Sequence, residues 1–341
     1  MPGSLNLSAA IYGIKGLQLS AEEKAFFRAA RPYGFILFAR NCESPAQVSA
    51  LVSELKALSG RDNLPVLIDQ EGGRVARLKP PHWPKYPPAG VFAGLYQTNP
   101  KQAEAAVFLN ARLIASDLAA LGITVDCAPL ADLPVSGAHD IIGDRAFGNA
   151  PAQVIALARA MANGLAAGGV VPVLKHIPGH GRARADSHEE LPVVNEPLDV
   201  LRQTDFVPFK ALADLPMAMT AHVLYTAIDK ERMATVSPAA IYLIREELGF
   251  KGLLMSDDIS MKAMQGNFTQ RARDALAAGC DVVLHCNGEM KEMQAIAEGT
   301  SGLSGVSLAR AESAMQGAGR ANAFDVADAR AQLADMLKIA A

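Results

Sequence analysis

The chain has 341 residues, of which 50% are hydrophobic and 20% are charged. This composition excludes a disordered chain, which combines low hydrophobicity with a high net charge. Lys and Arg number 32 against 35 Asp and Glu, a net charge of −3, and no Lys/Arg run is present, so a nucleic-acid-binding surface is not favoured.

The cysteines and the N-terminal residues bear on the cellular compartment. The four cysteines are too few and too scattered for a disulfide framework, and no CxxC pair suggests zinc. The first sixteen residues lack a basic stretch followed by a long apolar one, so we expect no signal peptide. No apolar run approaches the ~18 residues of a membrane span. We therefore expect a soluble, cytoplasmic protein with reduced thiols.

Eight short apolar runs, often rich in β-branched residues, predict buried parallel strands. Each run is too short to be a typical helix. The predicted strands are 9–14, 34–39, 65–69, 123–129, 170–175, 217–222, 253–257 and 282–285.

Helix-like segments lie between these runs. The segment 20–30 begins with Ser20, a good N-cap, followed by Glu22 and Glu23 at the positive end of the helix. The segments 44–58 and 237–248 both begin with Ser-Pro, which places proline at the first helical position. Further helices are predicted at 101–121, 152–167 and 198–213, and over most of 308–337.

The alternation of strand and helix repeats about eight times without a break in composition, which predicts an α/β protein with a (β/α)₈ TIM barrel. No Pro/Gly/Ser-rich linker divides the chain, so we expect residues 1–341 to form a single domain with C-terminal helices. The alternative is an open doubly wound sheet. It would require a GxGxxG turn after the first strand, which residues 12–16 lack.

Active sites of such barrels lie at the carboxyl ends of the strands, and charged residues follow the third and fourth predicted strands. Asp69 directly follows an apolar run, so it either binds something or pairs with Arg74 or Arg77. Asp132 follows the fourth strand. Arg145 lies in the segment IGDRAFG, where its guanidinium is either aimed at a ligand or held in an ordinary surface salt bridge.

The fifth strand ends in the densest group of reactive residues, KHIPGHG followed by DSH. A proline and two glycines prevent a helix, so His176 and His180 do not share a helix face as in an HExxH metal site. Asp186 lies near His188, and such a carboxylate orients an imidazole and raises its basicity, which suits a general acid/base. The competing interpretation is a surface loop with solvated histidines.

Two adjacent acids, Asp257 and Asp258, close the seventh predicted strand. Because side chains alternate along a strand, we expect Asp257 to point into the barrel mouth and Asp258 to cap a helix or pair with an arginine. His222 lies at the end of the sixth strand. It either adds another polar side chain to the wall of the site or is a rim histidine with satisfied hydrogen bonds. Carboxylates together with Arg, Lys and His around one strand-end nucleophile suit a polyhydroxylated substrate such as a sugar.

Four segments carry a resemblance to a known family: IDQEGGRVARL, IGDRAFG, KHIPGHGRARADSHEELP and MSDDISM, at residues 68–78, 142–148, 175–192 and 255–261. They resemble glycoside hydrolase family three, and within it the single-domain bacterial β-N-acetylhexosaminidases of cell-wall recycling. The third segment is long and highly specific.

The resemblance implies a retaining exo-β-N-acetylglucosaminidase. Asp257 would be the nucleophile that forms a covalent glycosyl-enzyme, His188 the proton donor and acceptor, and Asp186 the dyad partner of His188. The residues implied to hold the terminal N-acetylglucosamine are Asp69, Arg77, Arg145, Lys175 and His176.

The implied substrate is N-acetylglucosamine linked to 1,6-anhydro-N-acetylmuramic acid, with or without a stem peptide, in peptidoglycan recycling. The expected partner is thus a small muropeptide or disaccharide, with no nucleic acid and no membrane. We further expect a monomer that needs no cofactor and no metal.

Three rival functions are weighed against this one. A phosphorylase would use the same residues and transfer the glycosyl group to phosphate. A metal-dependent hydrolase would have a His-x-His at the end of the first strand, which residues 10–16 lack. A non-catalytic sugar-binding barrel would not need both Asp257 and the Asp186–His188 pair.

Overall fold

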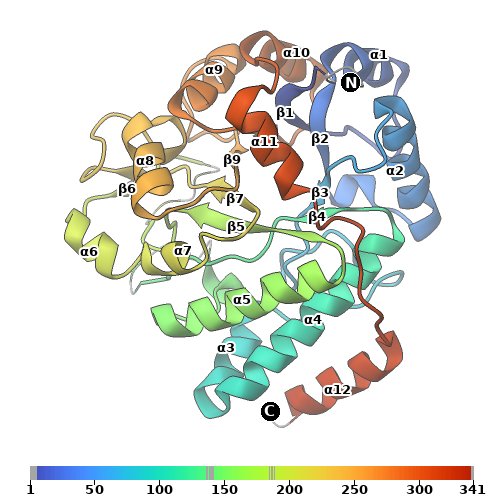
Figure 1. Ribbon diagram of the computed structural model, residues 1–341, viewed down its shortest axis with the longest axis vertical. Helices are drawn as coiled ribbons and strands as arrows, with labels where there is room; N and C mark the ends of the chain where they lie inside the picture. The colour runs from blue at the N-terminus through green and yellow to red at the C-terminus, as the bar shows by residue number, and fades with distance from the viewer. Residues whose placement is uncertain are drawn as a thin grey trace.

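In the computed structural model, parallel strands close into an eight-stranded barrel surrounded by helices (Figure 1). The structure describes residues 6–338 except 136, 138–141, 184, 186 and 188. Around the barrel the strands run in the order β1 (Ser8–Gly13), β2 (Pro32–Leu37), β3 (Val66–Ile68), β4 (Val125–Asp126), β5 (Val171–Ile177), β7 (Met217–Thr220), β9 (Leu253–Asp258) and β10 (Val282–His285). The predicted TIM barrel is confirmed, and each predicted strand overlaps one of these.

Several helices of the outer layer begin where the capping signals predicted. The Ser20 hydroxyl accepts a hydrogen bond from the Glu23 amide in a capping box, and the Ser44 and Ser237 hydroxyls each accept a hydrogen bond from one backbone amide at the start of their helices. The outer helices are α1 (Ala21–Ala30), α2 (Pro45–Ser59), α3 (Ala89–Thr98), α4 (Pro100–Ala120), α5 (Pro151–Ala167), α6 (Leu198–Gln203), α7 (Val207–Ala211), α8 (Pro238–Tyr242), α9 (Phe268–Ala278) and α10 (Met290–Gly299).

The helix prediction differs from the structure in several segments. The segments that form α3, α9 and α10 were not predicted to be helical. The predicted helix at 198–213 is two short helices, α6 and α7. The predicted helix at 237–248 begins as α8 and ends in a π-helical turn, Leu243–Glu247.

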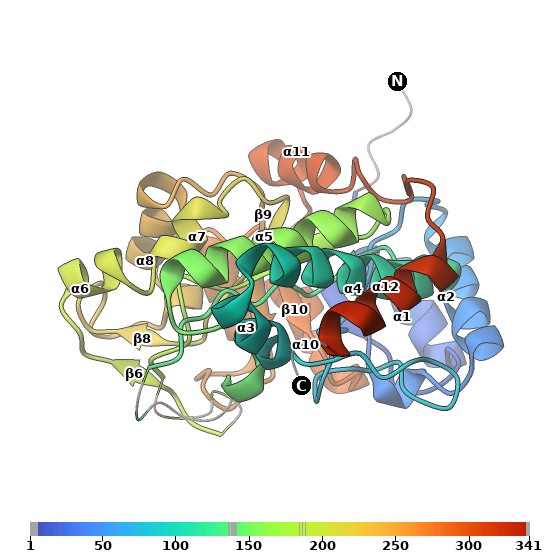
Figure 2. The same ribbon diagram turned by 90° about the horizontal axis from the view of Figure 1, so that it is seen from below.

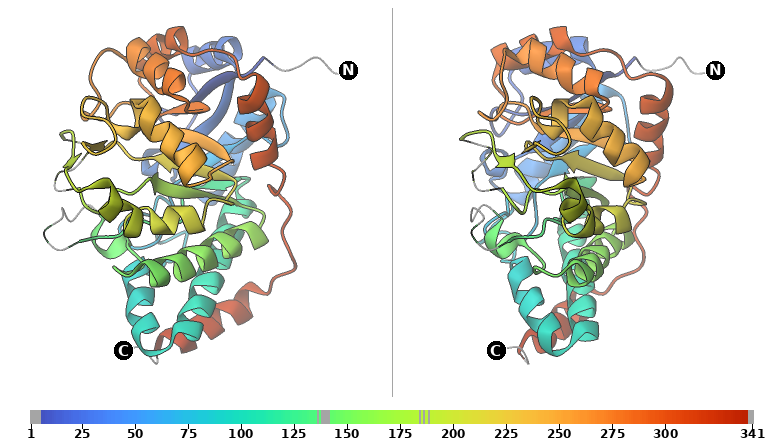
Figure 3. Two further views of the ribbon diagram at one scale, coloured as in Figure 1. Left: turned by 60° about the vertical axis from the view of Figure 1, so that its left-hand side comes forward. Right: turned by 90° about the vertical axis from the view of Figure 1, so that its left-hand side faces the viewer.

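The C-terminal stretch is also split, into α11 (Gly305–Ala314) and α12 (Val326–Lys338). Two glycines between them, Gly317 and Gly319, do not favour a continuous helix, and Gly319 has a positive φ. Helix α11 packs against apolar barrel residues, and its Ala311 carbonyl accepts a hydrogen bond from Tyr33. The chain then runs along the side of the barrel to α12, which packs on α4 (Figure 3).

The two ends of the barrel are closed differently. Helix α11 lies at the end opposite the short parallel pair β6 (Val193–Val194) and β8 (Leu224–Tyr225), as Figure 2 shows. The interior is apolar, with Ile11, Leu67 and Val173 among its fully buried residues, so the barrel is a packed core rather than a pore. In the part of the chain that the structure describes, no helix combines the length and apolar character that a membrane crossing needs.

Candidate active site

A cavity of about 280 Å³ lies at the carboxyl ends of the barrel strands. Its apolar walls come from several strands and loops, and Phe38, Met219 and Met261 are among them. Its polar wall brings together six of the residues singled out from the sequence, which are Asp69, Arg77, Arg145, Lys175, His176 and Asp257. Residues nearly 190 positions apart in the chain therefore share one cavity.

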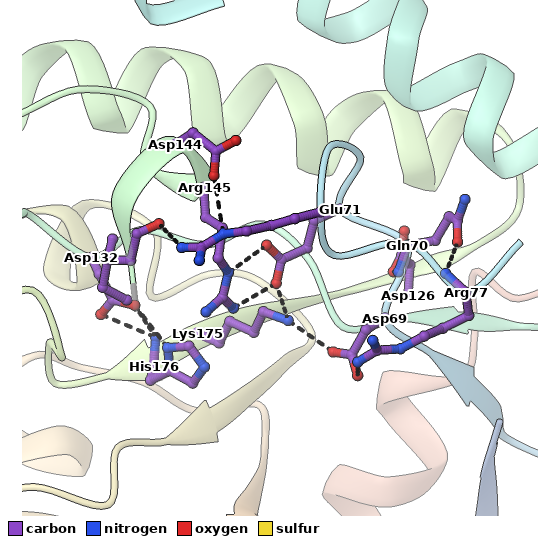
Figure 4. A network of polar contacts seen from close by, with 12 residues as sticks. Asp69, Gln70, Glu71, Arg77, Asp126, Asp132, Asp144, Arg145, Lys175 and His176 are labelled. Atoms are coloured by element: carbon purple, nitrogen blue, oxygen red, sulfur yellow. Dashed lines mark hydrogen bonds and ion pairs between the residues drawn. The ribbon is translucent and has the colours of Figure 1, made fainter. Parts of the chain in front are cut away.

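Lys175 is the centre of the ion-paired side of this cavity (Figure 4). Its side chain is only 2% exposed, and its Nζ lies 2.9 Å from Asp69 Oδ1 and 2.6 Å from Glu71 Oε1. Arg77 adds a second ion pair to Asp69, at 3.0 Å. Burial alone would raise the pKa of Asp69, but the charges of Lys175 and Arg77 outweigh it and hold that pKa below its usual value. Asp69 is therefore an ionised acceptor of two ion pairs.

Glu71 is a member of this site that the sequence reasoning missed. Arg145 donates to both of its carboxylate oxygens, from Nε at 2.9 Å and from Nη2 at 2.8 Å. Against the effect of burial, Lys175 and Arg145 lower the pKa of Glu71 to about 2. The side chains of Arg145 and Glu71 are largely buried, so the interpretation of Arg145 as an ordinary surface salt bridge is wrong.

Gln70 holds the loop that brings Arg77 to the cavity. Its side-chain oxygen accepts hydrogen bonds from the amides of Arg77 and Leu78, and its side-chain nitrogen donates to the Leu78 carbonyl. Within this loop, Gly72 and Gly73 adopt positive φ, and a Cβ on either would clash with the Tyr86–Pro88 backbone or the Pro88 side chain. The sequence signal for this arrangement was the segment QEGGR, of which only Arg74 had been considered, as a possible partner of Asp69.

Asp132 organises the two histidines of the fifth strand end. Its Oδ2 lies 2.7 Å from His176 Nδ1, and its Oδ1 accepts a hydrogen bond from the His180 amide at 2.6 Å. Asp132 is fully buried, whereas both histidines line the cavity. Burial, with His176 nearby, lowers the pKa of His180 to about 4. His180 therefore lines the cavity as an uncharged side chain at neutral pH.

Asp257 and Asp258 lie at the end of β9, and both line the cavity. Asp257 Oδ1 accepts a hydrogen bond from the Asp258 amide at 2.8 Å. Asp258 accepts from the amide and the hydroxyl of Ser260, so it caps the turn after β9 and not a helix, as had been expected for it. The expectation that strand alternation turns Asp258 away from the cavity is wrong, because β9 is bulged between Met255 and Asp258.

His222 is not a wall of the cavity. It is completely buried, and both ring nitrogens are within hydrogen-bond distance of a partner, the Thr235 hydroxyl and the Asp258 carbonyl. The second of the two interpretations, a histidine with satisfied hydrogen bonds, is the correct one.

The predicted dyad of Asp186 and His188 lies outside the described residues. Ser187, between them, is described: it is buried, lines the same cavity as Asp257, and its carbonyl accepts a hydrogen bond from the Ala263 amide. Over the same described positions, no three His, Cys, Asp or Glu side chains are arranged so that they would hold a metal ion.

The fold and the polar cavity at the strand ends define the architecture of a TIM-barrel enzyme. The family model described as "Glycosyl hydrolase family 3 N terminal domain" matches residues 10–316, and the chain belongs to this family. It is 43% identical over 286 residues to a β-hexosaminidase of Alkalilimnicola ehrlichii, covering 82% of this chain and 81% of that protein. A β-hexosaminidase of Methylobacillus flagellatus is 36% identical, over 90% of this chain and 88% of that one.

The solved structures agree with the sequence relatives. The crystal structure of NagZ from Neisseria gonorrhoeae in complex with N-trifluoroacetyl-D-glucosamine matches with a TM-score of 0.86 at 30% identity, over 98% of this chain and 99% of that one. The chain is an enzyme, a glycoside hydrolase of the β-N-acetylhexosaminidase class.

Proposed function

We propose that the chain is a retaining exo-β-N-acetylglucosaminidase that releases terminal N-acetylglucosamine from its linkage to 1,6-anhydro-N-acetylmuramic acid in peptidoglycan recycling. The observation that carries the proposal is that Asp257 shares one cavity with the Asp69–Lys175–Arg77 ion-pair network. The volume of about 280 Å³ lies at the lower end of ligand pockets, which suits a single terminal sugar ring. The named relatives are β-hexosaminidases, and the NagZ structure holds a glucosamine derivative.

The ion-paired side of the cavity is the proposed sugar-binding half. Charged donors and acceptors there are already fixed by one another, so they meet sugar hydroxyls with little reorganisation on binding. His176 has one ring nitrogen committed to Asp132, which leaves the other for a ligand. The residues proposed to hold the terminal sugar are Asp69, Arg77, Arg145, Lys175 and His176.

Asp257 and His188 are the proposed catalytic residues. In the first step a carboxylate oxygen of Asp257 bonds to C1 of the sugar, the C1–oxygen bond to the leaving group breaks, and the leaving oxygen takes the proton of His188. In the second step a water oxygen bonds to C1, His188 takes a proton from that water, and the bond from C1 to Asp257 breaks. The configuration at C1 is inverted twice and so retained.

A histidine suits the acid/base role without much tuning. Its ordinary pKa of about 6.5 lies close to neutral pH, whereas a carboxylic acid in that role must have its pKa raised by burial. Asp186 would orient the imidazole and stabilise its charged form. The position of Ser187 on the cavity wall supports this assignment, because Ser187 is the direct neighbour of both residues.

The test compares 4-nitrophenyl β-N-acetylglucosaminide with the corresponding glucoside and galactoside, each with and without inorganic phosphate. We expect fast release of 4-nitrophenol from the first compound only, with N-acetylglucosamine as the product. An equal rate on the glucoside would overturn the proposed specificity. A sugar phosphate as the main product in phosphate buffer would replace the hydrolase with the phosphorylase.

A further inference from the structure

Three buried polar side chains lie behind Asp257, outside the cavity wall. Thr220 ends β7, His222 follows it, and Thr235 lies in the 3-10 turn η3 (Ala234–Val236). All three are 0% exposed, and none of them lines the cavity. Buried polar groups are costly unless their hydrogen bonds are satisfied, so their partners show what they stabilise.

The contacts of these three side chains form a continuous series. The Asp257 amide donates to Thr220 Oγ1 at 3.3 Å, and the Thr220 and Thr235 hydroxyls lie 2.8 Å apart. Thr235 Oγ1 lies 2.7 Å from His222 Nδ1, and His222 Nε2 lies 3.0 Å from the Asp258 carbonyl oxygen. The series therefore begins on the backbone of Asp257 and ends on the backbone of Asp258.

The chemistry of the two ends gives the series one direction. A carbonyl oxygen only accepts, so the proton of His222 is on Nε2, and in a neutral imidazole Nδ1 is then an acceptor. Burial lowers the pKa of His222, which favours this neutral form. Thr235 therefore donates to Nδ1 and Thr220 donates to Thr235. The Ala221 carbonyl, at 3.2 Å from Thr235 Oγ1, is a longer alternative acceptor.

The series of hydrogen bonds lies just beyond the point where the ladder between β7 and β9 ends. Strands β7 and β9 are paired only from Met217↔Leu253 to Met219↔Met255, two residues short of Asp257. Beyond that point the backbone of the nucleophile strand has no β7 partner in the ladder, and the Thr220 hydroxyl takes the place of the next carbonyl. The Asp257 amide and the Asp258 carbonyl belong to the two peptide groups that flank the Asp257–Asp258 peptide, so the series holds both ends of this dipeptide on the β7 side, while β10 pairs with Asp258 on the other side.

We propose that Thr220, Thr235 and His222 form a positioning ring that holds the Asp257 carboxylate at the distance and angle needed to attack the sugar. The inference rests on the proposed role of Asp257 as the nucleophile. The three residues touch no substrate and are positioning residues. A displacement of a reacting group by about 1 Å can cost ~100-fold in rate, so loss of the ring should affect turnover more than binding.

The experiment uses Thr235→Val, which removes the hydroxyl at nearly constant volume, beside Thr235→Ser, which keeps it. For Thr235→Val we expect kcat on 4-nitrophenyl β-N-acetylglucosaminide to fall about 10- to 100-fold. KM and the inhibition constant of N-acetylglucosamine should change less than about twofold, since the proposed sugar-binding residues lie at β3, β4 and β5. Thr235→Ser should restore most of kcat.

Thr124→Val is the matched control. Thr124 is also a buried threonine, and its hydroxyl accepts from the Val66 amide and donates to the Leu64 carbonyl, away from the cavity. We expect this variant to lose stability without a change in kcat. Should Thr235→Val not fold, Thr220→Val removes the contact to the Asp257 amide directly and carries the same prediction.

A folded Thr235→Val enzyme with normal kcat, or one in which only KM rises, would contradict the proposed positioning role of the ring. Failure of Thr235→Ser to restore turnover would overturn it as well. These results differ from a failure of the proposed function: if Asp257→Ala kept its turnover, the nucleophile assignment itself would be wrong, whatever the ring variants did.

Discussion

The two halves of the cavity are held in place by different forces. On the β3–β5 side, buried ion pairs fix the side chains, with Lys175 between Asp69 and Glu71. On the β7–β9 side, neutral groups make the hydrogen bonds: the Thr220 hydroxyl accepts from the Asp257 amide, and the His222 imidazole contacts the Asp258 carbonyl. Ion pairs keep charged groups charged and stationary, which suits binding. For the proposed nucleophile, contacts on the backbone fix the position from which its carboxylate attacks carbon, which suits a group that must react at a set distance.

The largest effect should come from Asp257→Ala, which removes the proposed nucleophile and leaves the ion-paired half intact. We expect kcat to fall by at least ~10³-fold, with N-acetylglucosamine binding and thermal stability close to those of the wild type. Steady-state kinetics measures kcat, titration with N-acetylglucosamine measures binding, and thermal unfolding measures stability. Weak sugar binding in the variant would show that the two halves are not independent.

His188→Ala should cost about 10²- to 10⁴-fold, but only on substrates with poor leaving groups. The disaccharide substrate needs a proton on its leaving oxygen, whereas a 2,4-dinitrophenolate leaves without one. We therefore expect kcat/KM for the disaccharide to fall far more than that for the dinitrophenyl glycoside. Thr235→Val, in contrast, should slow both substrates equally. Equal losses for His188→Ala would argue against its role as the acid.

Arg145→Ala acts in the binding half, and its effect should be smaller. The variant loses a bidentate partner of Glu71 and one donor on the cavity wall. We expect kcat/KM to fall about 10- to 100-fold, mainly through a higher KM. Arg159→Ala, which removes a guanidinium paired with Asp214 on the protein surface, is the control and should leave KM unchanged. A loss confined to kcat would contradict the proposed role of Arg145 in binding the sugar.

The sequence predicted the barrel and most of the cavity wall because these depend on local patterns. Short apolar runs predict strands, and in a closed parallel barrel all strand ends meet at one face, so Asp69, Lys175 and Asp257 are brought together by topology alone. The resemblance then assigned roles to these positions that spacing alone does not give.

The residues that were missed depend on contacts that no local pattern encodes. Glu71 belongs to the site because Lys175, more than a hundred residues later, lies 2.6 Å away. The role of His222 depends on Thr235, which arrives from a separate turn, and on a backbone carbonyl that has no sequence signature. The bulge in β9 likewise decides where Asp258 points, and simple alternation predicts the opposite.

One carboxyl in the ion-paired half departs from the pattern of its neighbours. Asp126, on β4, is completely buried, and its Oδ1 accepts a hydrogen bond from the Gln70 amide at 2.9 Å. Its Oδ2 has no hydrogen-bond partner among the residues that the structure describes. Burial therefore raises the pKa of Asp126 to about 7, whereas Lys175 and Arg77 hold the pKa of nearby Asp69 below its usual value.

The two carboxyls should therefore change stability with pH in opposite directions. The pKa of Asp126 is higher in the folded than in the unfolded chain, where it is about 3.9, so its ionisation costs stability as pH rises from about 4 to about 7. Asp126→Asn keeps the acceptor for Gln70 and removes this cost. We expect stability equal to wild type near pH 4 and higher by about 2–4 kcal/mol at pH 8, measured by denaturant unfolding.

Asp69→Asn should do the reverse. The pKa of Asp69 is lowered in the folded state, so its contribution to stability is present above about pH 4 and is lost as pH falls through the folded pKa. We expect a loss at pH 8 that shrinks towards pH 3, whereas the gain from Asp126→Asn grows with pH. If the two variants instead ran parallel to the wild type across this range, ionisation would not be what distinguishes the two carboxyls, and Asp126 would need a partner that keeps it charged.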